Sequence, residues 1–369
     1  MTLYPVAVPK WGLAMEEGTL STWLVKEGAI VAQGDEIAEI ESSKIANVFE
    51  APAAGVLRRI VAQEGDLNPV GALLAVIADG DEDDAVIDAF VAEYQDRFAT
   101  EAVDQVSGPV PEVAAVPGGN IRYLKVAGGD ATPVVLLHGF GGDYLNWMMN
   151  QAALAEGRDV YAVDLPGHGE SYKQLGDASL DELAQSIAAW MGLQGLEKAH
   201  VVGHSMGAGV ALALAAVEPE RVHSITGICG VGFGGTLNSA YVEGFTDAEK
   251  RKELKGVVEL LFTNAELVSR EMLDDLLAYK RIDGVDAALR GLLVNALSAA
   301  SVAEAEARRQ AAAVPVLAIY GDSDQVVATP DEAARPSGAV LITGAGHMPQ
   351  LEAADAVNAA ISAFVRAHD

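Results

Sequence analysis

The stretch Glu-Ile-Glu-Ser-Ser-Lys-Ile-Ala, residues 39–46, joins two segments in which apolar and polar residues alternate. Upstream, isoleucine and alanine interleave with glutamate over residues 36–41, and downstream Val48 and Phe49 continue the pattern. A period of two is typical of half-buried strands, and serine is common in turns. The stretch therefore predicts a hairpin that carries one ammonium group, that of Lys44, at its tip.

The sequence around this hairpin occurs twice. Glu27-Gly28, Gly34 and Ile-Ala-Glu-Ile at residues 37–40 recur further along as Glu64-Gly65, Gly71 and Leu-Ala-Val-Ile at residues 74–77. Each half is too small to bury its apolar face alone, so the two halves are expected to close against each other. We predict an all-β flattened barrel over residues 1–79, with Lys44 at the junction of its halves.

Residues 1–79 resemble a lipoyl domain, and Lys44 in Glu-Ser-Ser-Lys-Ile falls where that family carries its lipoylated lysine. The resemblance implies lipoate bound covalently to Lys44 and a lipoate-attaching enzyme as a partner. The related biotin carrier domain is the alternative, but its lysine lies between two methionines. Here Ser43 and Ile45 flank the lysine, which favours lipoate.

Composition excludes several classes of function. The formal net charge of −29 opposes nonspecific binding to nucleic acid or to anionic lipid. The single cysteine, Cys229, leaves no disulfide framework and no cysteine-based zinc cluster, and a buried thiol is the simplest interpretation. Neither a signal core at the N-terminus nor a long uncharged apolar run is present, so we expect a cytoplasmic protein without a membrane span.

An acidic segment follows the predicted barrel. Over residues 83–100 the apolar side chains of Val86, Phe90, Tyr94 and Phe98, with Ile87 and Val91 beside them, recur at helical spacing. We predict an acidic linker over residues 80–111 with an amphipathic helix, and hinges at residues 79–80 and 108–119. Two interpretations stay open: the helix packs on the domain that follows it, or it docks another subunit.

From residue 112 to 369, segments of strand and helix character alternate, which predicts a doubly wound, mostly parallel sheet covered on both faces. Between about residues 232 and 313 the strand signal is lost and helical sequence rich in Leu, Glu and Lys takes over, as in a helical lid. The expected strands are residues 121–126, 133–137, 159–163, 200–202, 224–228, 316–320 and 340–343.

A nucleophile motif lies in this second domain. Gly-His-Ser-Met-Gly, residues 203–207, comes between an apolar strand and a helix, where a strained turn would expose the hydroxyl of Ser205. A serine hydroxyl needs an oriented base, and a histidine in turn needs an acid. Downstream, Asp322 and Asp324 follow one predicted strand, and His347 lies in a glycine loop after the last strand.

These motifs, together with Leu-His-Gly-Phe-Gly-Gly at 137–142 and Asp-Leu-Pro-Gly-His-Gly-Glu-Ser at 164–171, resemble the α/β-hydrolase fold over residues 115–369. The resemblance implies Ser205 as nucleophile, His347 as general base and Asp324 as the acid, with Asp322 as the alternative acid. It further implies an oxyanion hole formed by the backbone amides of Phe140 and Met206. No metal-binding set is evident in the sequence.

A lipoyl domain joined to an α/β-hydrolase domain resembles the family of dihydrolipoamide acetyltransferase components of bacterial acetoin-cleaving dehydrogenase complexes. That resemblance implies coenzyme A as cosubstrate and two partner enzymes, a thiamine diphosphate-dependent acetoin-cleaving component and a flavin-dependent dihydrolipoamide dehydrogenase. The chain lacks the His-x-x-x-Asp-Gly motif of the usual 2-oxo acid dehydrogenase acyltransferases, so their large cores are not expected.

Two other functions fit the same residues. The first is a serine hydrolase, a thioesterase or esterase, with a tethered lipoyl carrier and water as the acyl acceptor. The second is a scaffold that only binds partners, which the complete set Ser205, Asp324 and His347 disfavours. Acetyl-CoA or acetate as the product distinguishes transferase from hydrolase.

Overall fold

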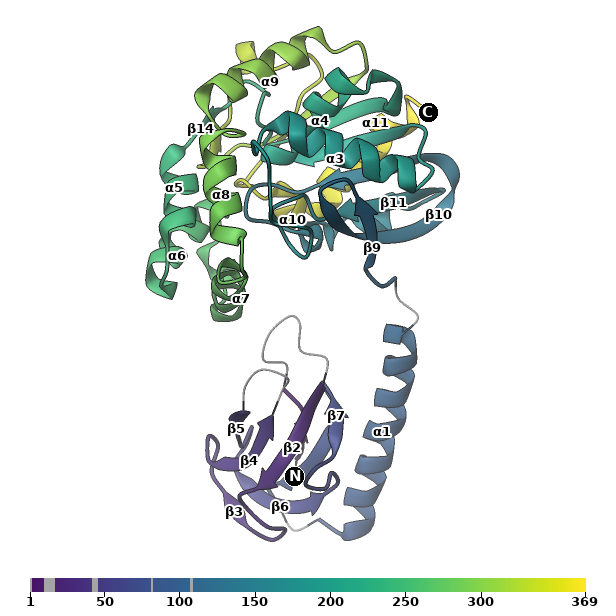
Figure 1. The fold of residues 1–369 in the computed structure, drawn as a ribbon. Helices are drawn as coiled ribbons and strands as arrows, with labels where there is room; N and C mark the ends of the chain where they lie inside the picture. Colours follow the sequence, from purple (N-terminus) through teal and green to yellow (C-terminus); the bar gives the residue numbers. More distant parts are fainter. Residues whose placement is uncertain (1, 10–16, 42–45, 81, 107–108) are drawn as a thin grey trace. The chain divides into compact units, whose positions relative to one another are not determined.

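The computed structural model describes residues 2–9, 17–41, 46–80, 82–106 and 109–369 (Figure 1). The chain divides into two compact units, Met1–Gly108 and Pro109–Asp369. This division falls close to residue 112, where the sequence predicts that the second domain begins.

The first unit is built on two four-stranded antiparallel sheets. One has the order β1 (Leu3–Ala7), β8 (Leu73–Ala78), β6 (Gly55–Ile60), β3 (Ile30–Val31), and the other β5 (Ala46–Glu50), β4 (Glu36–Glu41), β2 (Glu17–Trp23), β7 (Leu67–Pro69). The apolar residues of the alternating pattern, among them Leu20, Ile37, Ile40, Leu57, Leu74 and Ile77, form one buried cluster between the sheets. The expected all-β fold is confirmed.

The internal repeat is visible in the backbone. Gly28 and Gly65 occupy equivalent places in the two halves, with φ of 86° and 91°, and Gly34 and Gly71 do so with φ of 90° and 86°. This left-handed conformation is open to glycine and unfavourable for other residues. The repeat therefore encodes the same two turns twice.

The predicted hairpin joins β4 and β5. These strands pair in antiparallel fashion, with Glu39 opposite Val48 and Glu41 opposite Ala46 at the end of the ladder. Lys44, the predicted lipoylation site, lies outside the described residues.

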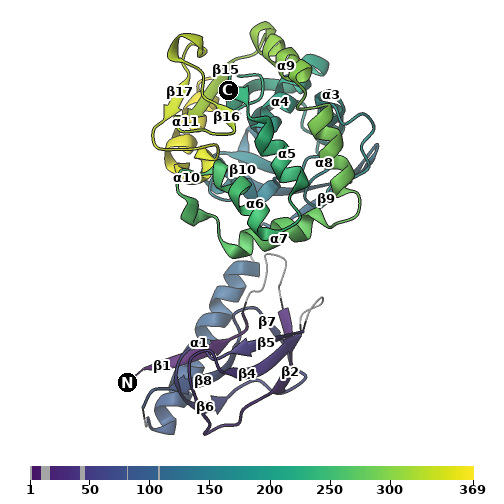
Figure 2. The ribbon, with the colours of Figure 1, turned by 90° about the vertical axis from the view of Figure 1, so that its left-hand side faces the viewer.

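Helix α1 (Asp84–Val106) packs on the barrel of its own unit. Ile87 is fully buried against Leu73 and Val76 of β8, while Phe90 and Tyr94 are half-buried beside it. The Tyr94 hydroxyl donates to the Gly71 carbonyl at 3.0 Å, and Figure 2 shows α1 running along the barrel. The apolar face expected to pack on the following domain or on another subunit is thus covered by β8 of its own unit.

Two details of the linker prediction also need correction. Val86, placed on the apolar face by its spacing, is 51% exposed, whereas Ile87 of the same predicted face is fully buried. The hinge expected at residues 79–80 is wrong because this stretch is held in place. The Thr2 amide donates to Asp79 Oδ1 at 2.7 Å, and Arg58 donates to the Glu82 carbonyl at 2.8 Å.

The second unit contains a mixed sheet of seven strands. Its order is β11 (Arg158–Val163), β10 (Gly119–Leu137), β12 (Ala199–His204), β13 (Val222–Ile228), β15 (Val316–Gly321), β17 (Val340–Ile342), and β9 (Glu112–Val116) pairs with β10 in antiparallel fashion. The strands from β12 onward are all parallel to their neighbours, as predicted.

One pair of predicted strands is continuous. The sequence predicts separate strands at 121–126 and 133–137, but both belong to β10, which bends around β11. Val160 of β11 lies opposite Val126 of the first half and opposite Val134 of the second half. Small residues, including two glycines at 128–129, occupy the bend. They allow the two halves of β10 to pair with opposite edges of β11.

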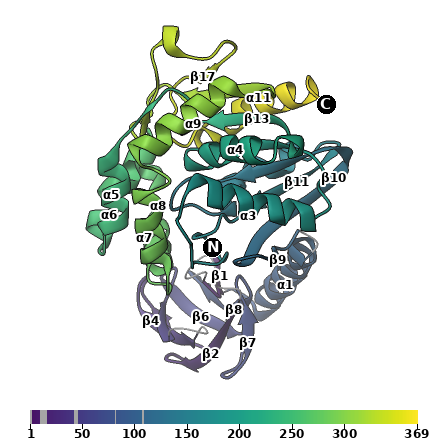
Figure 3. The same ribbon diagram turned by 45° about the horizontal axis from the view of Figure 1, so that its top comes forward.

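Helices cover both faces of this sheet. On one face α3 (Leu180–Leu193) and α4 (Met206–Val217) lie side by side, as Figure 3 shows. On the other face lie α2 (Gln151–Leu154) and α11 (Ala354–Arg366). Alternate residues of β10 point to opposite faces: Val135 and Leu137 join the cluster under α3 and α4, whereas Val134 and Leu136 join the other cluster.

A group of helices follows β13, where the sequence predicts a lid. These are α5 (Ser239–Asp247), α6 (Arg251–Val258), α7 (Arg270–Lys280), α8 (Val285–Val294) and α9 (Ala299–Ala311). They share the main buried cluster of the unit, since Leu254, Leu273 and Leu289 belong to it. Among the described residues, no single helix is long and apolar enough to cross a membrane, and only the bent pair α8 and α9 reaches that length together.

Candidate active site

Ser205 stands at a strained turn between β12 and α4. Its φ of 53° and ψ of −117° lie outside the regions that ordinary residues favour. The neighbouring glycines make the turn possible: a Cβ at Gly203 would come within 2.4 Å of the Ala208 nitrogen, and one at Gly207 within 2.3 Å of the Leu137 carbonyl oxygen. The Gly-x-Ser-x-Gly pattern is thus a steric requirement of this turn.

Backbone hydrogen bonds hold the strained residue. The Ser205 amide donates to the Ile228 carbonyl at 2.9 Å, and its own carbonyl accepts from the Val231 amide at 3.0 Å. Ile228 ends β13, the next strand of the sheet, and Val231 lies in the turn that follows it. Ser205 is only 6% exposed, so its hydroxyl is placed by the core of the unit and is largely shielded from bulk water.

The structure brings His347 and Asp324 together. His347 Nδ1 lies 2.9 Å from Asp324 Oδ2, and both residues are buried. Asp324 Oδ1 accepts from the amides of Val326 at 2.8 Å and Val327 at 2.9 Å. Burial raises the pKa of Asp324, but the charge and hydrogen bond of His347 and these two amides outweigh it, so the pKa lies below its ordinary value.

The alternative acid, Asp322, contacts the loop before His347 and not the imidazole. Its Oδ1 accepts from the Gly344 amide at 2.9 Å and from the Ser323 hydroxyl, at an exposed position. It therefore braces the loop that leads to His347, whereas Asp324 contacts the imidazole itself.

The loops that carry Ser205, His347 and Phe140 meet at the ends of the strands. His204 Nε2 lies 2.8 Å from the His347 carbonyl oxygen, so the residue before the serine touches the histidine. A Cβ at Gly139 would come within 2.9 Å of the Ser205 Cβ, which sets the Gly139–Phe140 backbone against the serine. Met206 opens α4, and the first amides of a helix lack partners within the helix.

Three other histidines have structural contacts. His138 accepts from the Leu165 amide at 3.0 Å and joins two loops, and His168 Nδ1 lies 3.2 Å from the Pro166 carbonyl oxygen. Burial lowers the pKa of His168 to about 4 and that of His204 to about 3. These rings are neutral near pH 7 and serve as fixed hydrogen-bonding groups.

Cys229 is a free, buried thiol at the end of β13. Its Sγ accepts from the Gly321 amide at 3.4 Å, and burial, followed by the charge of Asp324, raises the pKa of the thiol. The ligand atoms of Cys229, Asp324 and His347 lie within 4.8 Å of one another. The spacing of these residues along the chain gives no sign of this set, because its members come from three distant segments.

The loop of His347 is tied to the lid. The Leu261 carbonyl accepts from the His347 amide at 2.9 Å and from the Met348 amide at 3.2 Å. Glu352 Oε2 accepts a hydrogen bond from the Gly346 amide at 2.7 Å. Glu352 Oε1 accepts from the Thr263 amide at 2.7 Å and from the Thr263 hydroxyl at 2.6 Å. The spacing of Thr263 and Glu352 along the chain does not predict this hydrogen bond.

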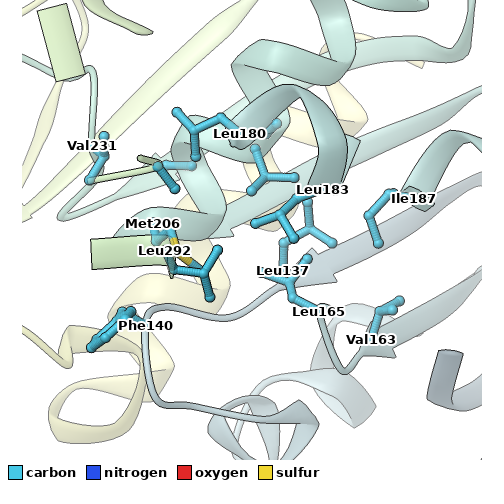
Figure 4. Packing of buried hydrophobic residues seen from close by; sticks show 14 of the residues in the cluster. Leu137, Phe140, Val163, Leu165, Leu180, Leu183, Ile187, Met206, Val231 and Leu292 are labelled. Carbon is cyan, nitrogen blue, oxygen red and sulfur yellow. The ribbon is translucent and has the colours of Figure 1, made fainter. Parts of the chain in front are cut away.

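Aromatic and apolar side chains enclose the site. Figure 4 shows Phe140, Met206 and Leu292 grouped within the buried cluster, with Leu292 coming from lid helix α8. From lid helix α5, Phe245 lies 5.8 Å from Phe140 between ring centroids, and Tyr241 lies 6.4 Å from His347. The site therefore combines a strained serine, a histidine–aspartate pair and an apolar enclosure, which suits acyl transfer through a serine ester.

Comparison with known proteins adds two family matches. Residues 5–77 match the family described as "Biotin-requiring enzyme", and residues 132–354 match the "alpha/beta hydrolase fold" family. Among solved structures, a meta-cleavage product hydrolase (CumD) is similar with a TM-score of 0.61 at 22% identity, covering 70% of this chain and 98% of that one. The naproxen esterase of Bacillus subtilis is similar with a TM-score of 0.56 at 20% identity, covering 70% of this chain and 91% of the esterase. These structures share the fold.

Two relatives match nearly from end to end. Both are named "Dihydrolipoyllysine-residue acetyltransferase component of acetoin cleaving system". The protein from Cupriavidus necator is 46% identical over 97% of this chain and 96% of its own, and that from Pseudomonas putida is 42% identical over 99% of each. The order of the two units is thus the same in these relatives.

Proposed function

Because the chain belongs to the family of dihydrolipoyllysine-residue acetyltransferase components of acetoin cleaving systems, we propose that it passes an acetyl group from lipoylated Lys44 through Ser205 to coenzyme A. The observation that carries this proposal is the hydrogen-bonded pair of His347 and Asp324, in the same site as the strained Ser205. A carrier unit in the same chain supplies the means to deliver an acyl group to that site.

The first unit fits a covalently attached lipoate. Its two sheets and helix α1 form a small body with its own core, and strands β4 and β5 pair up to the two residues that flank the Lys44 segment. Lipoate in amide linkage to that lysine supplies a dithiol that carries an acyl group as a thioester. The amide also removes the charge of the lysine.

The second unit supplies the chemistry. His347 removes the proton from the Ser205 hydroxyl while Asp324 holds the imidazole through Nδ1. The serine oxygen attacks the thioester carbonyl, the new C–O bond forms, the C–S bond breaks, and the proton passes from His347 to the departing thiolate. The amides of Phe140 and Met206 are placed to donate to the oxyanion that develops.

The second half of the reaction reverses these roles. His347 takes the proton of the coenzyme A thiol, the sulfur attacks the acetyl ester of Ser205, and the proton returns to the serine oxygen as the C–O bond breaks. Acetyl-CoA and free Ser205 result. The proposal thus needs no group beyond these side chains, two amides and the two thiols.

The relatives' names place them in a system with further components. We propose as partners a thiamine diphosphate-dependent component that loads the carrier, a flavin-dependent dehydrogenase that reoxidises it and a lipoate-attaching enzyme, all in the cytoplasm. A net charge of −29 would favour partner surfaces of basic character at the contacts.

A mass and product assay tests the proposal. Intact-mass analysis of protein from lipoate-fed cells should show one lipoyl group, and the Lys44→Arg variant should show none. Acetylated, lipoylated protein mixed with coenzyme A should give acetyl-CoA. Acetate as the sole product, with coenzyme A present, would establish a hydrolase and contradict the proposal.

A further inference from the structure

We infer that lid helix α5 selects a thiol over water as the acyl acceptor, through the rings of Tyr241 and Phe245. This inference rests on the proposed acetyl transfer and adds to it the residues that decide the fate of the acetyl-serine. Water is present at far higher concentration than any thiol, so a transferase of this kind must disfavour hydrolysis at the site itself.

Tyr241 lies over the general base. Its ring centroid is 6.4 Å from that of His347, with the planes at 56°, and the residue is only 4% exposed. Burial, with a smaller effect from the charge of Asp324, raises the pKa of its hydroxyl. Tyr241 is therefore a neutral aromatic cover beside the imidazole that activates the incoming nucleophile.

Phe245 continues this cover to the oxyanion side. It lies one helical turn after Tyr241, 6.3 Å away between ring centroids, and meets Phe140 edge to face at 5.8 Å. A Cβ at Gly141 would come within 2.6 Å of its ring, so the ring sits directly on the loop that carries Phe140. Tyr241, Phe245 and Phe140 thus form a continuous aromatic wall, named here the α5 wall, from the base to the oxyanion loop.

The wall is fixed by a half-buried cation. Lys280 of α7 donates to the Phe245 carbonyl at 2.5 Å and to the Ala248 carbonyl, and its ammonium lies 5.5 Å from the Phe245 ring centroid. These contacts hold the last turn of α5 against α7. The aromatic rings therefore keep their place over the site and do not follow a loose helix end.

An aromatic wall treats the two acceptors differently. A water molecule needs two to four polar partners to be held in a site, and ring faces offer few. Sulfur, by contrast, makes favourable contacts with aromatic rings. The acetyl-serine carbonyl carbon forms a C–S bond with the thiol or a C–O bond with water. In both cases His347 takes the proton and Ser205 leaves, so the wall acts on access and not on the steps of the chemistry.

The ratio of products tests this inference. Full-length protein carrying an acetyl group is mixed with coenzyme A, and acetyl-CoA and acetate are measured together. Tyr241→Ala should raise the acetate share by about tenfold, the upper range of one sulfur–aromatic contact. Tyr241→Phe keeps the ring and should restore a low acetate share. Phe245→Leu, which keeps apolar volume, should raise it by a smaller factor.

Val294→Ala is the matched control, because Val294 is a lid residue that is 67% exposed at the end of α8. Its acetate share should equal that of the wild type. If the wild type gives acetyl-CoA and both Tyr241→Ala and Phe245→Leu leave the share unchanged, the inference is wrong while the proposed function stands. If the wild type gives only acetate, the proposed function itself fails.

Discussion

The two units of this protein treat their reactive residues in opposite ways. In the hydrolase unit every proposed catalytic side chain is buried: Ser205 is 6% exposed, His347 1% and Asp324 9%. In the carrier unit the proposed lysine belongs to the segment between β4 and β5, past the end of their ladder at Glu41 and Ala46. One unit encloses its chemistry, and in the other the proposed lysine lies, in sequence, between the ends of two paired strands.

The difference follows from what each unit must do. A carrier has to be accepted by several enzymes, so its reactive group belongs away from its core. A site that makes and breaks a serine ester has to keep water out and hold its groups in place. The same contrast appears in their helices: α1 adds one apolar stripe to a finished barrel, whereas the lid helices share the main core of the hydrolase unit.

The largest expected effect is that of Ser205→Ala, which removes the nucleophile of the hydrolase unit. Acetyl transfer to coenzyme A should fall by about 10⁶-fold, as for other serine triads. The extent of lipoylation of the same variant, measured by intact-mass analysis, should be unchanged because the carrier unit has its own core. Substantial acetyl transfer by Ser205→Ala would remove the serine from the pathway.

The next effect separates the two acids. Asp324→Asn should lower acetyl transfer by about 10⁴-fold, because the asparagine can hold the imidazole in the wrong tautomer. Asp322→Asn should cost about tenfold or less, since its oxygen can still accept from the Gly344 amide. The assay is the rate of acetyl-CoA formation by the two purified variants side by side. The opposite ranking would reassign the acid.

On the carrier side, Ile87→Ala should destabilise the first unit. Ile87 is fully buried between α1 and β8, and truncation of such a side chain costs about 2–5 kcal/mol. Its neighbour Val86 is 51% exposed, so Val86→Ala is the control and should change the free energy of unfolding little. Denaturant unfolding monitored for each unit should show the loss in the carrier unit alone. A loss shared by both units would mean that α1 also supports the hydrolase core.

The smallest effect concerns the connection between lid and base. Thr263→Val removes the hydroxyl that Glu352 accepts from, and should lower kcat by about tenfold with little change in KM. Thr263→Ser keeps that hydroxyl and should restore the rate. A rise in KM without a change in kcat would show that this connection shapes substrate binding and does not position His347.

Much of the site could be predicted from sequence because short local motifs determine the turns that carry its residues. The Gly-x-Ser-x-Gly stretch forces its own turn, since any Cβ at Gly203 or Gly207 would collide with backbone. The repeated turns of the barrel are likewise local, with glycine at each left-handed position. The fold of both units follows from such patterns together with strand alternation.

What sequence could not supply were contacts between distant segments. Helical spacing indicates an apolar face on α1 but not which unit covers it, and β8 proved to be the partner. Glu352 and Thr263 meet at the loop of His347 across a long separation in the chain, and Tyr241 reaches the same histidine from the lid. Such contacts depend on the tertiary packing of side chains that are unremarkable in the sequence.

The most direct test of acetyl transfer through Ser205 is to trap the acetyl-serine. Protein with an acetylated lipoyl arm is quenched in acid without coenzyme A, digested and analysed by mass spectrometry. We predict one acetyl group on the peptide that contains Ser205, its disappearance after a pulse of coenzyme A, and its absence in the Ser205→Ala variant. Rapid formation of acetyl-CoA by that variant, without any acetyl-serine in the wild type, would contradict the account.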